Sequence, residues 1–374
     1  MISDRLGVVG VPVAGPGPWP FAARVPRFRA AIHHPGGPMT AAGADLHGDP
    51  QVARERCVAE GVERYAATVP RVPHAIGSSV ELTRSGFDLL APERLGAVVG
   101  PTTPIGWLSA VDGRLVPLNA ALGHLSAYAP RAGEGTYPQG STGLAAGLDL
   151  VTARESASAE VLERDVVARA WREGALLPTT PLRPPLRRLA DDAGLDASAH
   201  LLPTGHAASR VALVALRHSR RRLLGVGAAY RPDPARALEK AFTEAVVSLG
   251  QAAEVLDPRT GPGMCEAPGL ASWRADRAYA RNGWGHVDDL AGHVQLLLDP
   301  RLQRAVWARF TGQPPTALPA GRGRPASELL TGSATVDLTP PDITGHVVCR
   351  VLTPGAEVVR PAAFTPEELP CPLV

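Results

Sequence analysis

Residues 53–65 read ARERCVAEGVERY, and residues 153–165 read ARESASAEVLERD. The two segments share an early arginine, two glutamates three residues apart and a closing arginine. The residues of this pattern are Arg54, Glu60, Glu63 and Arg64 in the first copy, and Arg154, Glu160, Glu163 and Arg164 in the second. Because residues three apart lie on one face of a helix, each copy presents a pair of carboxylates on one side. One copy alone would indicate a solvated helix face. Two matched copies support a ligand-binding site as strongly as a solvated face.

Helix signals flank both copies. We expect a helix over about 50–68, because Asp49 followed by proline is a typical N-cap and first helical residue. The second copy lies in a helix expected over roughly 151–173. A third helix is expected over about 234–255, again after an Asp-Pro pair, and it carries Glu244. Three predicted helices therefore bear glutamates in similar settings.

Such helices could bring four or five carboxylates to one cavity. Carboxylates gathered in this way repel one another unless cations lie between them. Mg²⁺ prefers oxygen ligands, and Mg²⁺ ions with a polyphosphate between them would remove the repulsion. The flanking arginines could bind phosphate oxygens in a forked geometry. The repeat thus favours a site for a magnesium-bound polyphosphate.

The rest of the chain mixes short strands with helices. Strands are expected at 6–13, 97–99, 107–116 with a turn at Asp112-Gly113, 211–216, 223–229 and 345–352. Shorter helices are expected at 186–193, 287–298 and 301–311, and loops at 131–143 and 312–342. Strands and helices do not alternate in a regular βαβ pattern, so the sequence predicts an α+β fold with mixed sheets.

Composition excludes several functions. The 38 basic and 36 acidic residues give a net charge of +2, too small for the basic field of a nucleic-acid-binding protein. Lys240 is the only lysine, which excludes a P-loop and any Schiff base formed elsewhere. The Gly225-Val226-Gly227 segment lacks the third glycine of a dinucleotide fingerprint. A nucleotide site would therefore be built mainly from Glu, Mg²⁺ and Arg.

The cysteines and the N-terminus bear on the compartment. Cys57, Cys265, Cys349 and Cys371 are far apart and lack the spacing of a metal site, so we expect free thiols in a reducing environment. The first residues do not open a signal peptide, and no apolar run is long enough to span a membrane. We therefore expect a soluble cytoplasmic protein with neither membrane nor nucleic acid as a partner.

Further motifs accompany the repeat. Residues 141–147 read STGLAAG and precede the second copy, residues 225–244 read GVGAAYRPDPARALEKAFTE, and residues 351–357 read VLTPGAE. Together with ARERCVAEGVERY and the later ExxERD, these segments resemble the YcaO-domain family over about residues 50–374. The combination is far more specific than any one segment. The resemblance implies one YcaO-type domain over 1–374, with an N-terminal strand and loop region at 1–49 and a proline-rich tail at 365–374.

In that family, Glu-bearing helices surround a cavity that binds ATP. The resemblance therefore implies that Glu60, Glu63, Glu160 and Glu163 are ligands of Mg²⁺ or of the nucleotide. It gives supporting roles to Arg64 and Arg164, and to Glu244 as a weaker candidate. Well-known members phosphorylate a peptide amide oxygen with ATP while a Cys, Ser or Thr side chain attacks the carbonyl, which yields an azoline. The implied enzyme is an ATP-dependent cyclodehydratase that modifies a ribosomally made peptide.

The carboxy-terminus also enters the resemblance. Azoline-forming members tend to end in a PxPxP-like tail that enters the active site, and this chain ends Pro370-Cys371-Pro372-Leu373-Val374. Alternating prolines would hold the tail extended, and the terminal carboxylate of Val374 could act as a base. An ordinary disordered terminus is an equal alternative. Implied partners are a precursor peptide, a separate leader-peptide-binding subunit resembling a ubiquitin-activating enzyme and a flavin-dependent azoline dehydrogenase; a homodimer is left open.

Two other functions stay open. The first is thioamide formation, in which sulfide replaces the activated amide oxygen. The second is a degenerate scaffold that binds a partner without phosphoryl transfer. Thr152 stands where the family usually has a further glutamate and Arg56 stands where it has a serine, and these departures favour a scaffold. The intact Glu pairs of both copies favour an enzyme.

Overall fold

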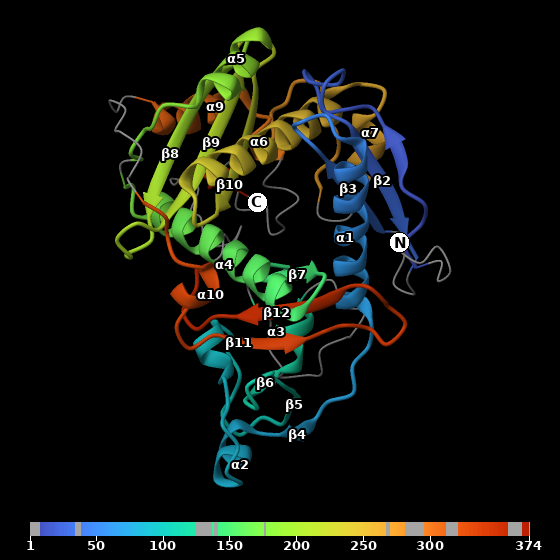
Figure 1. The fold of residues 1–374 in the computed structure, drawn as a ribbon, viewed down its shortest axis with the longest axis vertical. Coiled ribbons are helices and arrows are strands. Elements are labelled where there is room, and N and C mark those ends of the chain that lie inside the picture. The colour runs from blue at the N-terminus through green and yellow to red at the C-terminus, as the bar shows by residue number, and fades with distance from the viewer. Residues whose placement is uncertain are drawn as a thin grey trace. The chain divides into compact units, whose positions relative to one another are not determined.

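The structure is a computed structural model, and it describes residues 8–33, 39–123, 137, 141–175, 177–266, 270–280, 295–311, 321–357 and 369–373. The chain forms two compact units (Figure 1). Unit 1 comprises Met1–Gly15, Pro26–Leu162 and Pro325–Ala356, and unit 2 comprises Pro16–Val25, Glu163–Arg324 and Glu357–Val374. Helices are mixed with small antiparallel sheets, so the α+β prediction is confirmed.

Unit 1 holds three sheets of three strands each among its described residues. The first has β1 (Val13–Gly15), β2 (Arg27–Ile32) and β3 (Met39–Ala44); the second has β4 (Ala75–Gly77), β5 (Ile105–Ser109) and β6 (Leu115–Pro117); the third has β11 (Ala334–Asp337), β12 (Val347–Leu352) and β7 (Leu144–Gly147). The helical segments are α1 (Pro50–Thr68), α2 (Ser79–Arg84), η1 (Pro92–Leu95), α3 (Leu118–Leu122), α10 (Ala326–Leu329) and the first half of α4 (Leu150–Arg172).

Helix α1 follows from its sequence. Asp49 caps its N-terminus by accepting bonds from the backbone of Gln51 and Val52, and the helix ends at Thr68, as predicted. Its buried face includes Cys57, Val58 and Val62 and packs against β2, β3, β7 and β12. This packing fixes the rotation of α1 and therefore which way its glutamates point.

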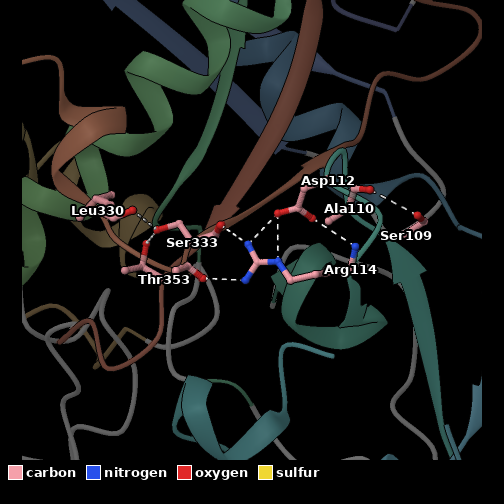
Figure 2. A network of polar contacts seen from close by, with 8 residues as sticks. Ser109, Ala110, Asp112, Arg114, Leu330, Ser333 and Thr353 are labelled. Atoms are coloured by element: carbon pink, nitrogen blue, oxygen red, sulfur yellow. Dashed lines mark hydrogen bonds and ion pairs between the residues drawn. The ribbon is translucent and has the colours of Figure 1, made fainter. Parts of the chain in front are cut away.

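The hairpin of β5 and β6 is joined to the third sheet of unit 1 by Arg114 (Figure 2). Its guanidinium binds Asp112 Oδ2 through Nη2 at 2.7 Å and donates through Nη1 to the Gly332 carbonyl at 2.9 Å. It also donates to the Ser333 carbonyl. The predicted hairpin with its Asp112-Gly113 turn is thus confirmed, and Arg114 links it to the residues just before β11, next to a backbone bond from Val111 N–H to the Thr335 carbonyl at 2.8 Å.

Unit 2 is built on one antiparallel sheet of β10 (Leu223–Tyr230), β9 (Arg210–His218) and β8 (Asp196–Pro203), in that order. Helix α6 (Pro234–Leu256) lies across β9 and β10 (Figure 1). A Cβ at Gly227 would lie 2.3 Å from the Ala241 carbonyl oxygen, so this glycine allows the helix to approach the strand. The other described helices are α5 (Pro184–Asp192), α7 (Gly261–Met264), α9 (Pro300–Phe310) and the second half of α4.

Some predicted elements were wrong. Residues 97–99 form no strand, and Val98 is 95% exposed. The first strand begins at Val13, although Val9 makes an isolated bridge to Ile32. Strand β8 was not predicted, and it pairs with β9 along its whole length. Strand β11 and helix α10 were likewise missed inside a segment expected to be a loop.

Other expectations lie largely outside the described residues, namely the helix at 287–298 and the loop at 131–143. Among the described residues, no helix combines the length and the apolar character needed to cross a lipid bilayer. The expectation of a single domain over 1–374 stays a prediction.

Candidate functional site

In unit 1, the carboxylates of Glu60, Glu63 and Glu160 form a cluster that we call the first acidic cluster. Glu60 pairs with Arg64, one helical turn later, at 2.6 Å and accepts a bond from the backbone N–H of Ala42 at 3.2 Å. Both side chains of this pair are partly exposed, at 31% for Glu60 and 40% for Arg64. Glu60 on α1 is therefore hydrogen-bonded to the neighbouring strand β3, and its partner Arg64 is accessible to solvent.

Glu160 is placed by the loop that precedes the second copy. Its Oε2 accepts a bond from the backbone N–H of Gly143 at 3.0 Å. Gly143 has φ +83° and a Cβ there would lie 2.4 Å from the Val351 carbonyl oxygen, so this position requires glycine. The STGLAAG motif thus supplies a backbone donor to a carboxylate of the predicted site.

Glu63 lies between like charges. Burial raises its pKa well above the ordinary value, and the negative charges of Glu160 and Glu60 raise it further. The positive charges of Arg64 and Arg350 act in the opposite direction. These directions show that Glu63 lies within electrostatic reach of Glu60 and of Glu160, one acid from each copy of the repeat.

In unit 2, Glu163, Lys240 and Glu244 form a second group, which we call the second acidic cluster. Glu163 is 5% exposed, and its Oε1 accepts a bond from the backbone N–H of Tyr230 at 2.6 Å. Lys240 Nζ lies 3.9 Å from that carboxylate and 2.6 Å from Glu244 Oε1. Burial raises the pKa of Glu163 to about 7, while the charge of Lys240 lowers it. Glu163 and Glu244, two of the predicted acids, thus both lie close to Lys240.

The carboxy-terminal residues are buried in unit 2. Residues 370–373 have buried side chains, and Trp171 Nε1 on α4 donates to the Leu369 carbonyl at 2.9 Å. Burial raises the pKa of Cys371 to about 12, an effect that the positive charge of Arg164 opposes. Pro370 and Pro372 therefore flank a thiol that lies within the electrostatic reach of Arg164. Val374, the predicted base, lies outside the described residues.

The two departures from the family pattern have local structural roles. Thr152 forms the N-terminal turn of α4, where its Oγ1 and backbone N–H both bind Asp149 Oδ1. Arg56 pairs with the buried Asp45 at 3.1 Å and donates to the Ala44 carbonyl at 2.7 Å. Glu155, one turn after Thr152, accepts bonds from the backbone of Ala326 and Ser327 at the start of α10. These side chains therefore stabilise unit 1.

Two charged residues near the acids were missed as site residues. Lys240 stands four residues before Glu244 on a predicted helix, and this i,i+4 spacing could have indicated the ion pair. Arg350 is a charged residue within the apolar run VVCRVL, and such a residue in a buried strand calls for a partner. It is 1% exposed and lies within electrostatic reach of Glu63 and Glu160.

The donor set of both clusters suits Mg²⁺ and a nucleotide. Glutamate oxygens are hard ligands of the kind that Mg²⁺ prefers, and cations would relieve the repulsion that raises the pKa of Glu63. Over the described part of the chain, no three His, Cys, Asp or Glu side chains are already arranged to hold a metal ion. Mg²⁺ usually keeps several waters and is bound through one or two carboxylates plus phosphate oxygens, so a metal that arrives with its nucleotide fits these residues.

Comparison with known proteins agrees with this chemistry. A family model described as YcaO cyclodehydratase, ATP- and Mg²⁺-binding, matches residues 47–357. The structure of YcaO from Methanopyrus kandleri bound with AMPPCP and Mg²⁺ is similar at a TM-score of 0.66, with 18% identity over 95% of this chain and 87% of that one. A search of curated proteins found no match.

Two further solved structures share the fold. A heterocyclase in complex with substrate and cofactor has a TM-score of 0.68 and 18% identity, covering 96% of this chain and 51% of that chain. The Escherichia coli microcin synthetase McbBCD complex with pro-MccB17 bound has a TM-score of 0.63 and 13% identity, covering 93% of each chain. Because the family model spans most of the sequence, this chain belongs to the YcaO cyclodehydratase family, and its cofactors are ATP and Mg²⁺.

Proposed function

We propose that this protein activates backbone amides of a ribosomally made peptide with ATP and Mg²⁺, and cyclodehydrates Cys, Ser or Thr residues to azolines. The observation that carries the proposal is the crowding of Glu60, Glu63 and Glu160 within unit 1; within unit 2, a further pair of acids, Glu163 and Glu244, lies at Lys240. Carboxylates held in this way are suited to a cation-bound polyphosphate.

In this proposal the acids and the arginines of the repeat have separate tasks. Glu60, Glu63, Glu160 and Glu163, with Glu244, would hold Mg²⁺ and the nucleotide, while Arg64 and Arg164 would bind phosphate oxygens. Magnesium-bound ATP supplies a phosphoryl group to the amide oxygen, which turns a poor leaving group into a good one. Gly143 and Tyr230 orient the carboxylates of Glu160 and Glu163 through their backbone N–H groups, so these acids are positioned before any ligand binds.

The carboxy-terminus would supply the base. We assign proton removal from the peptide to the terminal carboxylate of Val374, with Pro370 and Pro372 holding the tail extended. The buried side chains of residues 370–373 support a fixed tail over a disordered one. Adding one glycine after Val374 keeps every side chain but moves the carboxylate by about 3.5 Å. We expect this variant to retain ATP binding and to lose cyclisation, and full cyclisation by it would contradict the assignment.

The substrate and partners are proposed from chemistry and from the solved relatives. Among these are a heterocyclase solved with its substrate and a microcin synthetase complex solved with pro-MccB17. For this chain we propose a Cys-, Ser- or Thr-containing precursor peptide delivered by a separate leader-binding subunit. A flavin-dependent dehydrogenase would oxidise the azoline afterwards.

Mass spectrometry tests the proposal. The protein is incubated with its candidate precursor, the leader-binding subunit, Mg²⁺ and ATP. Cyclodehydration predicts a loss of about 18 Da per modified residue, since the activated oxygen leaves as phosphate. A gain of about 16 Da in the presence of sulfide would instead show thioamidation, since sulfur replaces the same activated oxygen. Peptide binding without ATP consumption would contradict catalysis and support the scaffold that Thr152 favours.

Matched variants link the activity to the acids. Glu163→Gln should abolish ATP consumption, because the carboxylate at Tyr230 and Lys240 loses its charge. Glu239→Gln is the control, because Glu239 lies on the same helix as Glu244 and binds Arg183 at 3.2 Å instead. Full activity in Glu163→Gln would refute the site assignment.

A further inference from the structure

A fully buried arginine lies near the first acidic cluster. Arg350 lies in β12, the central strand of the sheet β11–β12–β7, and is 1% exposed. Its neighbours in the strand, Cys349 and Val351, are 0% and 1% exposed. Burying a guanidinium costs several kcal/mol unless nearby charges compensate. An arginine in such a strand therefore indicates negative charge close by.

The strand register shows where that charge lies. Arg350 is paired with Leu144 of β7, the residue after Gly143. Gly143 accepts a bond from Val351 N–H at 2.7 Å and donates to Glu160 Oε2 at 3.0 Å. Helix α1, which bears Glu63, also packs against both β7 and β12. The backbone thus brings Arg350, Glu160 and Glu63 to one part of unit 1.

The electrostatics agree with this placement. Burial lowers the pKa of Arg350 to about 10, and the negative charges of Glu160 and Glu63 oppose that decrease. The positive charge of Arg350 in turn lowers the pKa of Glu63. Each group is therefore stabilised in its charged form by the other.

A charge count shows the consequence. Counted as fully ionised, the carboxylates of Glu60, Glu63 and Glu160 and the guanidiniums of Arg64 and Arg350 give the first acidic cluster a formal charge of −3 + 2 = −1. Without Arg350 this formal charge would be −2, and the raised pKa of Glu63 would rise further. The buried arginine thus supplies a positive charge that opposes the binding of a metal cation on its own.

We infer that Arg350 is a built-in counter-charge that keeps the first acidic cluster stable without metal and prevents Mg²⁺ from binding alone, so that Mg²⁺ enters only as its nucleotide complex. This inference rests on the proposed function in taking Glu60, Glu63 and Glu160 as the magnesium and nucleotide acids. Arg350 acts through these carboxylates and is a positioning residue. The inference implies that metal and nucleotide bind to the site together.

The first test measures metal binding without nucleotide. Mn²⁺ is used as a paramagnetic stand-in for Mg²⁺, and free Mn²⁺ is followed by electron paramagnetic resonance. Arg350→Met should bind Mn²⁺ about tenfold more tightly than the parent protein, because one opposing positive charge is gone. Arg350→Lys, which retains the charge, should behave like the parent. Equal Mn²⁺ affinity in the parent and in Arg350→Met would overturn the inference.

The second test is a thermal-stability cycle. Arg350→Met should lower the melting temperature in EDTA, and either Mn²⁺ or the additional change Glu63→Gln should recover much of the loss, because both remove excess negative charge. If the single variant fails to fold, Arg350→Met with Glu63→Gln is still expected to fold. A loss that neither metal nor Glu63→Gln reduces would show that Arg350 serves packing alone. Neither test uses ATP turnover or peptide, so an inactive protein would contradict the proposed function and leave this result standing.

Discussion

Glu63 and Glu163 occupy matching positions in the two copies of the repeat, yet their surroundings differ. Glu63 has two neighbouring carboxylates that raise its pKa in addition to burial. Glu163 is more deeply buried and has a backbone donor at Tyr230 and a lysine as neighbours. Sequence equivalence therefore does not give equivalent chemistry. Mg²⁺ at Glu63 would relieve repulsion, whereas a ligand at Glu163 would compete with Lys240.

The raised pKa of Glu163 predicts a specific dependence of stability on pH. With a folded pKa of about 7, the native state keeps a proton on Glu163 that the unfolded state releases above its ordinary pKa of 4.5. The free energy of unfolding should therefore decrease as pH rises from about 4.5 to 7 and then level off. Urea unfolding from pH 4.5 to 8 should show that Glu163→Gln gains on the order of 1–3 kcal/mol relative to the parent over this range.

Further variants identify the cause of that pH dependence. The charges facing Glu163 are those of Lys240, Glu244 and Arg231. Removing the positive charge with Lys240→Met should raise the pKa of Glu163 further and extend the decrease in stability to higher pH. Parallel curves for Glu163→Gln and the parent protein would show that Glu163 does not titrate in this range.

Gly143 gives a second prediction for a single residue. Gly143→Ala adds a Cβ 2.4 Å from the Val351 carbonyl oxygen at a φ of +83°, so it should cost about 2 kcal/mol or more in stability and weaken nucleotide binding through Glu160. Gly174→Ala is the matched control, because φ there is +64° and nothing lies within 4 Å of the added atom. Its cost should stay near 1 kcal/mol, the cost of the left-handed backbone alone. Equal costs measured by urea unfolding would contradict the close contact.

Elements with local end signals were predicted well, and those that depend on a distant partner were not. Helices α1 and α6 both begin after a capping aspartate and a proline, and both were predicted within one or two residues. Strand β8 has no such signal and exists because β9 pairs with it, which a reading of local sequence does not reveal. The β9–β10 hairpin was predictable because its two apolar runs are separated by a short polar turn.

The Arg114 network gives a prediction for the β5–β6 hairpin. Arg114→Ala removes the bonds to the Gly332 and Ser333 carbonyls and the ion pair with Asp112, so the free energy of unfolding should fall by about 1–2 kcal/mol. Arg187→Ala on α5 is the control, because Arg187 and Asp191 form an exposed i,i+4 pair worth only about 0.3–0.5 kcal/mol. Urea unfolding measures both. A loss no greater in Arg114→Ala than in the control would show that the bonds from Arg114 to the Gly332 and Ser333 carbonyls add nothing to stability.

For the whole molecule, the repeat and the family resemblance were sufficient to name the acids but not their counter-charges. Glu60, Glu63, Glu160 and Glu163 could be proposed as site acids from the sequence because spacing on a helix is a local property. Lys240 and Arg350 were not recognised as neighbours of these acids, because their positions depend on how α6 packs on β10 and on the register of β12. Tertiary packing, rather than motif spacing, determines the charge balance.

Cofactor binding gives a prediction for the whole molecule. ATP with Mg²⁺ at 100 times its Kd should raise the free energy of unfolding by about 2.7 kcal/mol, which thermal unfolding would report as a higher melting temperature. EDTA should remove this increase, because in the proposed site the carboxylates would bind the nucleotide through Mg²⁺. Glu63→Gln should reduce this ligand-induced increase in the free energy of unfolding in proportion to its loss of affinity for ATP with Mg²⁺, while Glu239→Gln should leave the increase unchanged. An equal increase in the presence of EDTA would contradict a magnesium-dependent site.

The single lysine has a practical consequence. Lys240 is the only lysine in the sequence and so the only lysine side chain that amine-reactive reagents can modify, and its Nζ lies 3.9 Å from Glu163 and 2.6 Å from Glu244. Its side chain is 37% exposed, so a reagent can reach it, and its raised pKa means that labelling needs alkaline solution. Acylation at this one amine would therefore report chemically whether the second acidic cluster is covered. Lys240 can thus serve as a site-specific labelling position without any change to the sequence.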